Sequence, residues 1–355
     1  MSAPKTNEAT GVPPMKPLLN IVFNFSCAFA PLISAVISTS VFAQESTSNW
    51  SIGFGTSGKA TVEKENLVSN SSNNNPIDKL NSALNKTEPN VNPLPLSTIE
   101  DRANKGDAHY QFELGYMYYK GDGVTQNHPL AVQWYEKSAA QGFNHAITNL
   151  GFMYMMGYGV DKNYSKAIEL YEKAASKDFT EAYFHLGYMY EKGWGVEPSL
   201  EKTNELYEKA ANKNHTEAQY NLGIHYQFGK GLTKDDKKAM EWYKKAAEAD
   251  HYLAQRNLAY LYEKGEGVEH DYDLAMEWYK KAAKHNDPVA QNNLGLLYEY
   301  GKGTSKNWKN AIMWYTLACD NHEKAGCEGK DRIEAKIKKE NEDKNKTKIE
   351  NPSKK

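Results

Sequence analysis

A serine and a lysine three residues apart, Ser199 and Lys202, form the motif of this sequence with the clearest potential for covalent chemistry. The Ser-x-x-Lys arrangement supplies the nucleophile of penicillin-recognising enzymes. Those enzymes also use Ser-Asp-Asn and Lys-Thr-Gly motifs, and neither tripeptide occurs in this sequence. Ser199 also fits the position just before a helix, where a short polar side chain caps the backbone. We therefore expect Ser199 to have a structural role.

Paired glycines and histidines are the other residues with chemical potential. Gly-x-Gly sequences bind phosphate when they join a strand to a helix, but each pair here falls between two expected helices. The ten histidines lack metal-ligand spacing; His109 and His145 share one repeat position without a nearby Cys or His. We predict no catalytic, cofactor-binding or metal-binding residues. The net charge of −2 over 355 residues gives no sign of nucleic-acid binding.

The region from Asp107 to His322 consists of one 36-residue unit that occurs six times. An apolar-Gly pair, a Gly-x-Gly sequence and a tyrosine keep the same phase throughout. The pairs are Leu114-Gly115, Leu150-Gly151, Leu186-Gly187, Leu222-Gly223, Leu258-Ala259 and Leu294-Gly295. The tyrosines are Tyr135, Tyr171, Tyr207, Tyr243, Tyr279 and Tyr315. A fixed period of this size is typical of stacked units that share one core, and it favours binding over catalysis.

Each unit encodes two helices, which we call A and B. In the second unit Ala146, Leu150 and Met153 recur at offsets of three and four, so they line one face of helix A. The first glycine of Gly-x-Gly ends helix A, and a short polar residue caps helix B. These capping residues are Asn127, Asn163, Ser199, Asp235, Asp271 and Asn307. No unit can bury its apolar faces alone, so we predict an all-α fold, a right-handed α/α solenoid of six helix-turn-helix repeats with terminal capping helices.

The sequence on each side of the array offers a capping helix. Ser97 to Gly106 has the pattern of a lone helix B, with Ser97 and Glu100 as a capping box. Ala325 to Lys339 has the pattern of a last helix A whose outer side is polar. We therefore assign the solenoid to residues 97–340 and a charged, disordered tail to residues 341–355.

The N-terminal region has a different composition. Leu18 to Ala43 is the most apolar stretch and ends in a small-x-small site, which is typical of a secretory signal peptide. We assign residues 1–43 to this signal, with Met15 as an alternative start. The mature chain is then exported, to the periplasm or the exterior, and contacts a membrane only through an uncleaved signal. Residues 44–96 are rich in Asn and Ser, so we expect a disordered linker.

The repeated unit resembles that of the Sel-one-like repeat (SLR) family, a relative of the tetratricopeptide repeats. The shared pattern is Ala-x3-Leu-Gly-x2-Tyr-x2-Gly-x-Gly-Val, then Asp/Asn-x3-Ala-x2-Trp-Tyr-x-Lys-Ala-Ala, and it is clearest in Leu258 to Ala283 and Leu294 to Ala318. Ala259 replaces one glycine and Thr203 one alanine. The resemblance implies an α/α solenoid that binds proteins and assembles complexes. Bacterial members are often exported, and some act in envelope biology or at the host interface.

Cys319 and Cys327 lie eight residues apart, between the last helix B and the capping helix A. This spacing is similar to that of a disulfide-bearing SLR subgroup, in which each cysteine pair ties two helices. The resemblance therefore implies a disulfide, which an exported chain can form. The alternative is a pair of unbonded, buried thiols. The third cysteine, Cys27, lies in the expected signal peptide.

The resemblance also implies where a partner binds. Helix A faces inward in tetratricopeptide-like stacks, so its groove positions lie two residues before and two after the leucine of each Leu-Gly pair. Both positions vary between units and several are aromatic, which suits recognition because aromatic rings give large contact area with few rotamers. The predicted partner-binding residues are Phe112, Tyr116, Phe152, Phe184, Tyr188, Tyr220, Ile224, Arg256, Tyr260, Asn292 and Leu296. The alternative is that these side chains only pack between neighbouring A helices.

Together these features predict an exported protein–protein interaction scaffold that is not an enzyme. It is expected to bind a protein or peptide ligand in the concave groove, in envelope biology or host interaction, without a small-molecule cofactor or nucleic acid. The alternative is a cell-wall-related hydrolase or β-lactam-binding enzyme of the cysteine-rich SLR type, with Ser199 as its nucleophile.

Overall fold

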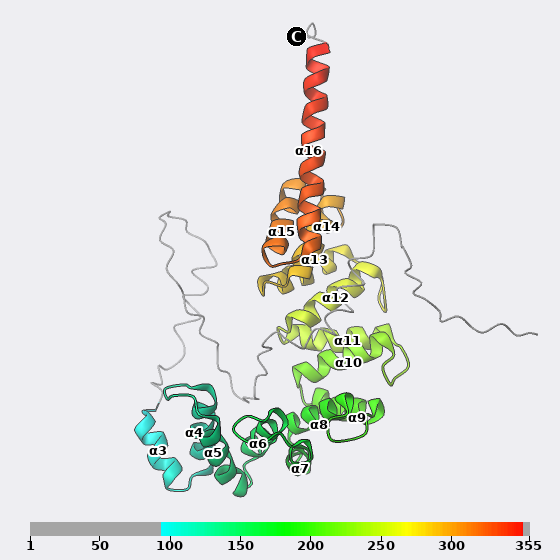
Figure 1. The fold of residues 1–355 in the computed structure, drawn as a ribbon. Helices are drawn as coiled ribbons and strands as arrows, with labels where there is room; N and C mark the ends of the chain where they lie inside the picture. Colours follow the sequence, from blue (N-terminus) through cyan, green and yellow to red (C-terminus); the bar gives the residue numbers. More distant parts are fainter. Residues whose placement is uncertain (1–93, 351–355) are drawn as a thin grey trace, which may run out of the picture. The chain divides into compact units, whose positions relative to one another are not determined.

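The computed structural model describes residues 94–350, with side chains up to residue 346, and these residues form fourteen helices and no strand (Figure 1). The helices are α3 (Leu96–Asn104), α4 (Ala108–Lys120), α5 (His128–Ala140), α6 (Asn144–Met156), α7 (Tyr164–Ala175), α8 (Thr180–Lys192), α9 (Leu200–Asn212), α10 (Thr216–Phe228), α11 (Asp236–Glu248), α12 (Tyr252–Lys264), α13 (Tyr272–Lys284), α14 (Pro288–Tyr300), α15 (Trp308–Asp320) and α16 (Lys324–Glu350). The expected signal peptide and almost all of the expected linker lie outside the described residues.

The helices pair in the order that the repeat predicts. The A helices are α4, α6, α8, α10, α12 and α14, and the B helices are the odd-numbered helices from α5 to α15. Each A helix packs against its own B helix, and each B helix packs against the next A helix. The all-α solenoid is therefore confirmed. All six predicted N-caps of the B helices are also confirmed; in α13, for example, Asp271 Oδ1 accepts a hydrogen bond of 2.9 Å from the amide of Leu274.

From the second repeat on, the two glycines of each Gly-x-Gly turn have different roles. In the fifth repeat Gly265 (φ 69°) caps α12 in the left-handed conformation, as the sequence predicts. Gly267 (φ 75°) lies against the start of α11, and a Cβ atom there would stand 2.4 Å from the carbonyl carbon of Asp236. The second glycine thus lets the turn of one repeat contact helix B of the preceding repeat, a role that the sequence analysis did not identify.

The core consists of the recurring residues of both helices. All six tyrosines at the repeated B-helix position are completely buried. In each repeat that has a Leu-Gly pair the glycine faces this ring; at Gly223 a Cβ atom would lie 2.4 Å from Cδ1 of Tyr243. The missing side chain of the glycine therefore allows helix A to approach the ring of helix B closely. Leu222 and Leu258, from the same pairs, are also completely buried.

The loops after α3 and after each B helix also contain a left-handed residue, which periodicity alone does not predict. This position is glycine in the first two loops, at Gly106 and Gly142. Further along it is held by Asp178, Asn214, Asp250, Asn286 and His322, with φ between 60° and 66°. Asn and Asp tolerate this conformation better than other residues with a Cβ atom, because their short side chains can hydrogen-bond locally.

The two capping helices exist, but their ends differ from the prediction. Helix α3 begins at Leu96 with Pro95 as its N-cap and no side-chain cap, so the predicted capping box at Ser97 is wrong. The amides of Thr98 and Ile99 are satisfied by the Pro95 carbonyl instead.

At the other end, α16 continues to Glu350, whereas the prediction placed disorder from residue 341. Its later residues are mostly Lys, Glu and Asn without Gly or Pro, and acidic and basic side chains alternate at a spacing of four, as in Glu340 and Lys344. Such pairs stabilise a helix even without a packed apolar face. Across the described residues, no helix combines the length and the apolar character needed to cross a membrane.

Candidate partner-binding surface

The first predicted groove position, two residues before each leucine, is buried in every repeat. Among the predicted partner-binding residues at this position, Tyr220 is the most exposed, at 8%. The side chains of Phe112, Phe184, Arg256 and Asn292 are more deeply buried. These side chains pack between neighbouring helices. The ring of Phe184, for instance, stacks on Tyr207 at 5.6 Å and on His215 at 4.5 Å between centroids. This position therefore offers little surface to a partner in the described structure.

The second predicted groove position, two residues after each leucine, is more accessible. Its side chains Tyr116, Tyr188, Ile224, Tyr260 and Leu296 are half-buried, and only Phe152 is fully buried. The half-buried side chains occur in every A helix except α6, so they form a row along the array. We call these five residues the A-helix row. It is the part of the predicted site that can contact a partner without rearrangement of the core.

Turn residues enlarge the A-helix row in the second and third repeats. The middle residue of Gly-x-Gly is Tyr158 in one and Trp194 in the other. Trp194 stacks on Tyr164 at 5.3 Å and meets Tyr188 edge-on at 5.4 Å. These two side chains are not among the predicted partner-binding residues, although a variable residue between two fixed glycines was a signal for them.

Lysines accompany the tyrosines of the A-helix row. Lys192 Nζ lies 5.2 Å from the ring centroid of Tyr188, and Lys264 Nζ lies 5.6 Å from that of Tyr260. Burial raises the pKa of Tyr188 to about 12, with a further increase from nearby Glu191. The phenol therefore stays protonated at neutral pH. The row combines aromatic contact area with hydrogen-bonding hydroxyls and adjacent positive charge.

Arg256 forms a buried ion pair at the first groove position. Its guanidinium Nη1 lies 3.0 Å from Oδ2 of Asp287, and both side chains are at most 5% exposed. Asp287 also caps α14, because its Oδ1 accepts from the amide of Ala290 at 2.7 Å. Asp287 lies 31 residues after Arg256 in the sequence, so the pattern within one A helix could not reveal this ion pair.

The buried tyrosine hydroxyls form hydrogen bonds in nearly every repeat. Tyr207, Tyr243, Tyr279 and Tyr315 each donate to a Glu or Gln of their own A helix, 16 residues earlier, at 2.8–2.9 Å. The next A helix provides an asparagine just before its leucine, as when Asn149 Nδ2 donates to Tyr135 at 3.3 Å. The tyrosine bonds join the two helices of one repeat, and the asparagine bond joins successive repeats.

The third repeat departs from this arrangement. Its residue before the leucine is His185, whose ring stacks on Tyr171 at 4.9 Å between centroids. Within the described part of the chain, the Nδ1 atom of His185 is buried without a hydrogen-bond partner. Burial lowers the pKa of His185 to about 3, with a smaller contribution from nearby His215. The imidazole is therefore neutral in the folded protein near neutral pH.

The C-terminal cap joins the array through a buried carboxylate. Glu299 of α14 is 1% exposed and accepts from Arg332 Nη2 at 2.6 Å, Lys336 Nζ at 3.1 Å and Tyr315 at 2.8 Å. Burial alone would raise the pKa of this carboxyl, but the bonds from Arg332, Tyr315 and Lys336 lower it overall. This ionic cluster fixes α16 against α14 and α15.

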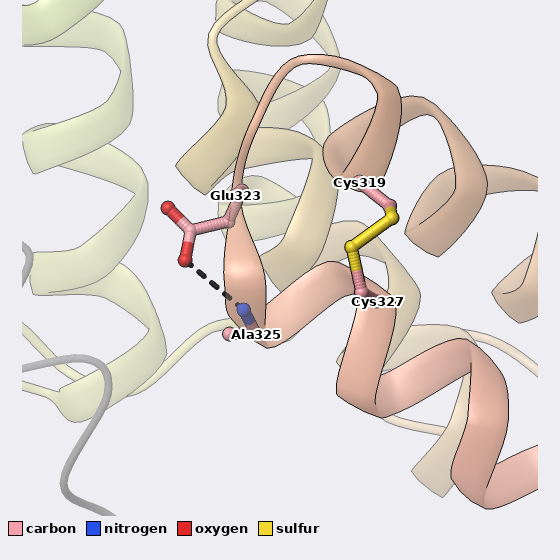
Figure 2. The surroundings of a disulfide bond; sticks show 4 residues. All are labelled: Cys319, Glu323, Ala325 and Cys327. Carbon is pink, nitrogen blue, oxygen red and sulfur yellow. Dashed lines mark hydrogen bonds between the residues drawn. A yellow bond between two sulfur atoms is a disulfide. The ribbon is translucent and has the colours of Figure 1, made fainter.

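A disulfide also joins α15 to α16. Figure 2 shows Cys319 near the end of α15 bonded to Cys327 in the first turn of α16. Their Cα atoms are 4.7 Å apart. In the loop between them Glu323 Oε1 accepts from the amide of Ala325 at 3.3 Å (Figure 2). The bond links the last B helix to the terminal A helix, which has a neighbour on only one side.

We expect Cys319 and Cys327 to be oxidised to each other in protein that is purified without reductant. Because the closed loop is short, reduction should lower the free energy of unfolding by about 2 to 3 kcal/mol. Thiol labelling of the denatured, unreduced mature chain should find no free cysteine. Two labelled cysteines per mature chain would show instead that the thiols are unbonded.

Ser199, the candidate nucleophile, has a structural role. Ser199 Oγ accepts from the amide of Lys202 at 3.3 Å and so caps α9. Among the described residues no group of His, Cys, Asp and Glu side chains has the arrangement of a metal site.

The comparisons with known proteins agree with this architecture. The chain matches the Sel1 repeat family over residues 108–143, 144–179, 180–215, 216–251, 253–287 and 288–322. A search of the curated proteins found no significant match.

Several solved structures are similar to the chain, and two of them are more than 30% identical to it. One is a protective antigen of uropathogenic Escherichia coli strains with an SLR fold, 32% identical at a TM-score of 0.60, where the alignment covers 64% of this chain and 49% of the antigen. The other is a Sel1 repeat protein from Oxalobacter formigenes, 34% identical at a TM-score of 0.53, covering 60% of this chain and 86% of that protein. The chain thus spans about half the length of the antigen. With six matched repeats over more than half of its length, the chain belongs to the Sel1 repeat family.

Proposed function

We propose that this protein is an exported scaffold that binds a protein or peptide partner along the A-helix row. The observation that carries the proposal is the contrast between positions within the repeat. The leucine and tyrosine of the core are the same in all six repeats, whereas the half-buried row varies between Tyr, Ile and Leu along the array. A surface that varies from unit to unit can bind successive, different side chains of an extended segment.

The chemistry of the row favours a peptide with apolar or aromatic anchors. Tyr188, Trp194 and Tyr260 offer rigid rings, and Lys192 and Lys264 lie beside them. Aromatic side chains are enriched at the energetic centres of protein interfaces because they bury large areas at a small cost in entropy. The adjacent lysines favour a ligand that also carries acidic groups or a carboxyl terminus.

Family membership and the termini support the rest of the proposal. Sel1 repeat proteins are generally interaction scaffolds, and the similar E. coli protein is described as a protective antigen. The apolar segment before residue 43 and the cysteine pair both fit a protein that leaves the cytoplasm. We propose a role in the envelope or at the host interface on these grounds.

Substitution of residues in the A-helix row should strongly weaken partner capture. With the mature chain as bait in envelope or host extracts, Tyr188→Ala combined with Tyr260→Ala should reduce the captured partner by about tenfold or more, because truncating such anchors costs about 2 kcal/mol each. The control exchanges exposed residues of the B helices, Glu205→Ala with Glu241→Ala, and should capture normally. Circular dichroism must show the same helix content in both variants. Equal capture by both would contradict the proposed surface.

A further inference from the structure

The outward face of the last B helix differs from that of the five B helices before it. In those helices two exposed positions, four residues apart, carry Gln or Glu and then Lys. The pairs are Gln133 and Lys137, Glu169 and Lys173, Glu205 and Lys209, Glu241 and Lys245, and Glu277 and Lys281. In α15 the same positions hold Met313 and Leu317, which are 48% and 40% exposed. The exchange of both polar residues for apolar ones is confined to this repeat.

The lysine of this position covers a tryptophan in three of the other B helices. Nζ of Lys137, Lys245 and Lys281 lies 3.6–3.9 Å from the ring centroid of the tryptophan three residues earlier. In α15 the tryptophan remains as Trp314, but Leu317 stands where the lysine would be. From residue 310 to residue 319 this helix has no charged side chain at all. Covering such a face requires little desolvation of charge.

The C-terminal helix packs on a different side of α15. Gly326 and Gly329 of α16 lie against Ala318 and Tyr315, where a Cβ atom would come within 2.6 Å and 2.7 Å of their side chains. Met313 and Leu317 stay exposed beside this contact (α15 is orange in Figure 1). Within the described residues, therefore, the apolar stripe is not covered by the cap that follows it.

Charges at both ends of the stripe indicate what covers it. Lys309 lies four residues before Met313, and Asp320 lies three residues after Leu317; both are exposed. The order along the helix is thus basic, apolar, apolar, acidic, with its centre near residue 315. A stripe of this kind is complementary to itself in the antiparallel direction, which is the relation between two helices that a two-fold axis perpendicular to them produces.

We propose that α15 is the contact of a homodimer, in which two copies pack antiparallel. Met313 and Leu317 of one chain meet the same residues of the other. Lys309 then faces Asp320 of the partner subunit, and this ion pair forms twice. A contact of one helix per chain is small, so the dimer is of the weak, concentration-dependent class. It would join two A-helix rows in one assembly and so raise the avidity for a partner with two binding segments.

Sedimentation equilibrium of the full mature, oxidised chain over a concentration series tests this contact. The wild-type mass should rise from one chain to two as the concentration increases. The variant Met313→Glu with Leu317→Lys recreates the pair of the other B helices, so the fold is retained, and it should remain a monomer throughout. The control exchanges the charges of α9, Glu205→Lys with Lys209→Glu, and should associate as the wild type does. Wild-type protein that is monomeric at every concentration, or a Met313/Leu317 variant that still dimerises, would overturn the proposal.

Charge reversal at the ends of the stripe tests the antiparallel arrangement. Lys309→Glu alone, or Asp320→Lys alone, places like charges opposite each other twice and should weaken the dimer by about tenfold or more. Both new residues suit their helix ends, because acidic side chains favour the N-terminus and basic ones the C-terminus. The double variant restores opposite charges and should return the dissociation constant to within about threefold of the wild type. A double variant as weak as the single ones would overturn the antiparallel contact.

Discussion

Lowering the pH from about 7 to about 4 is expected to reduce the free energy of unfolding by several kcal/mol, and His185 is expected to account for a large part of this loss. In the unfolded chain a histidine binds a proton with a pKa of about 6.5. In the folded protein burial lowers the pKa of His185 to about 3 and that of His225 to about 4, although Glu191 partly opposes the shift of His225. The unfolded state therefore binds more protons than the folded state below about pH 6.5.

The direction follows from this difference in proton binding. The contribution of each histidine is fully present above about pH 6.5 and decreases as the pH falls toward the folded pKa. One proton changes the free energy of unfolding by about 1.4 kcal/mol per pH unit, so we expect roughly 2 to 3 kcal/mol from each histidine by pH 4. Carboxylates with lowered pKa, such as Glu217 and Glu299, add a further loss at still lower pH.

The variant His185→Asn separates the histidine from the carboxylates. Asparagine is the residue at this position in four other repeats, at Asn149, Asn221, Asn257 and Asn293, so the fold should be retained. Urea unfolding at a series of pH values should give a shallower decline for the variant, by about 2 kcal/mol between pH 7 and pH 4. The reciprocal change, Asn149→His, should make the decline steeper. Identical slopes in wild type and His185→Asn would contradict the burial of a neutral imidazole.

Gly267→Ala is expected to destabilise the protein by about 3 kcal/mol or more. Two effects combine at this position. The residue has a φ of 75°, where a Cβ atom is unfavourable, and the added atom would lie 2.4 Å from the carbonyl carbon of Asp236 in α11. Because the obstacle is backbone, it can move only if the fifth repeat shifts away from the fourth. Thermal or urea unfolding of the variant measures the loss.

Gly106 provides the matched control. It also has a left-handed φ, of 95°, but a Cβ atom there would meet no other atom within 4 Å. Gly106→Ala should therefore cost only about 1 kcal/mol, the conformational part of the effect. Equal losses in the two variants would show that the close approach between repeats contributes nothing.

The architecture was predictable because every repeat has capping residues at the same positions and the same apolar periodicity. Asn163 or Asp271 at an N-cap, Gly157 or Gly265 at a C-cap and apolar residues at helical spacing each act within a few residues. They are also repeated six times in phase, so an error in one unit would be visible against the others. Only the ends lack this redundancy, and there the prediction misplaced the cap of α3 and the end of α16.

The candidate site was less predictable because burial depends on neighbours that are distant in sequence. Phe184 and Tyr188 both lie on helix A near the leucine, and their variation is similar. Yet Phe184 is enclosed by α9 and the start of α10, whereas Tyr188 is half-buried beside the turn. Arg256 and Asp287 likewise pair across a whole helix B. Periodicity specifies a face of a helix, but it does not specify which part of that face the next repeat covers.

Site-specific photo-crosslinking tests the central claim most directly, that the A-helix row binds a protein partner. A photoreactive phenylalanine analogue in place of Tyr188 or Tyr260 preserves the aromatic ring and reports contact within the intact complex. The same analogue at Lys209, on the exposed face of α9, serves as the control. We predict that the two row positions form a covalent adduct with one and the same partner from envelope or host extract, and that Lys209 forms none. Adducts at Lys209 but not at the row positions would contradict the account.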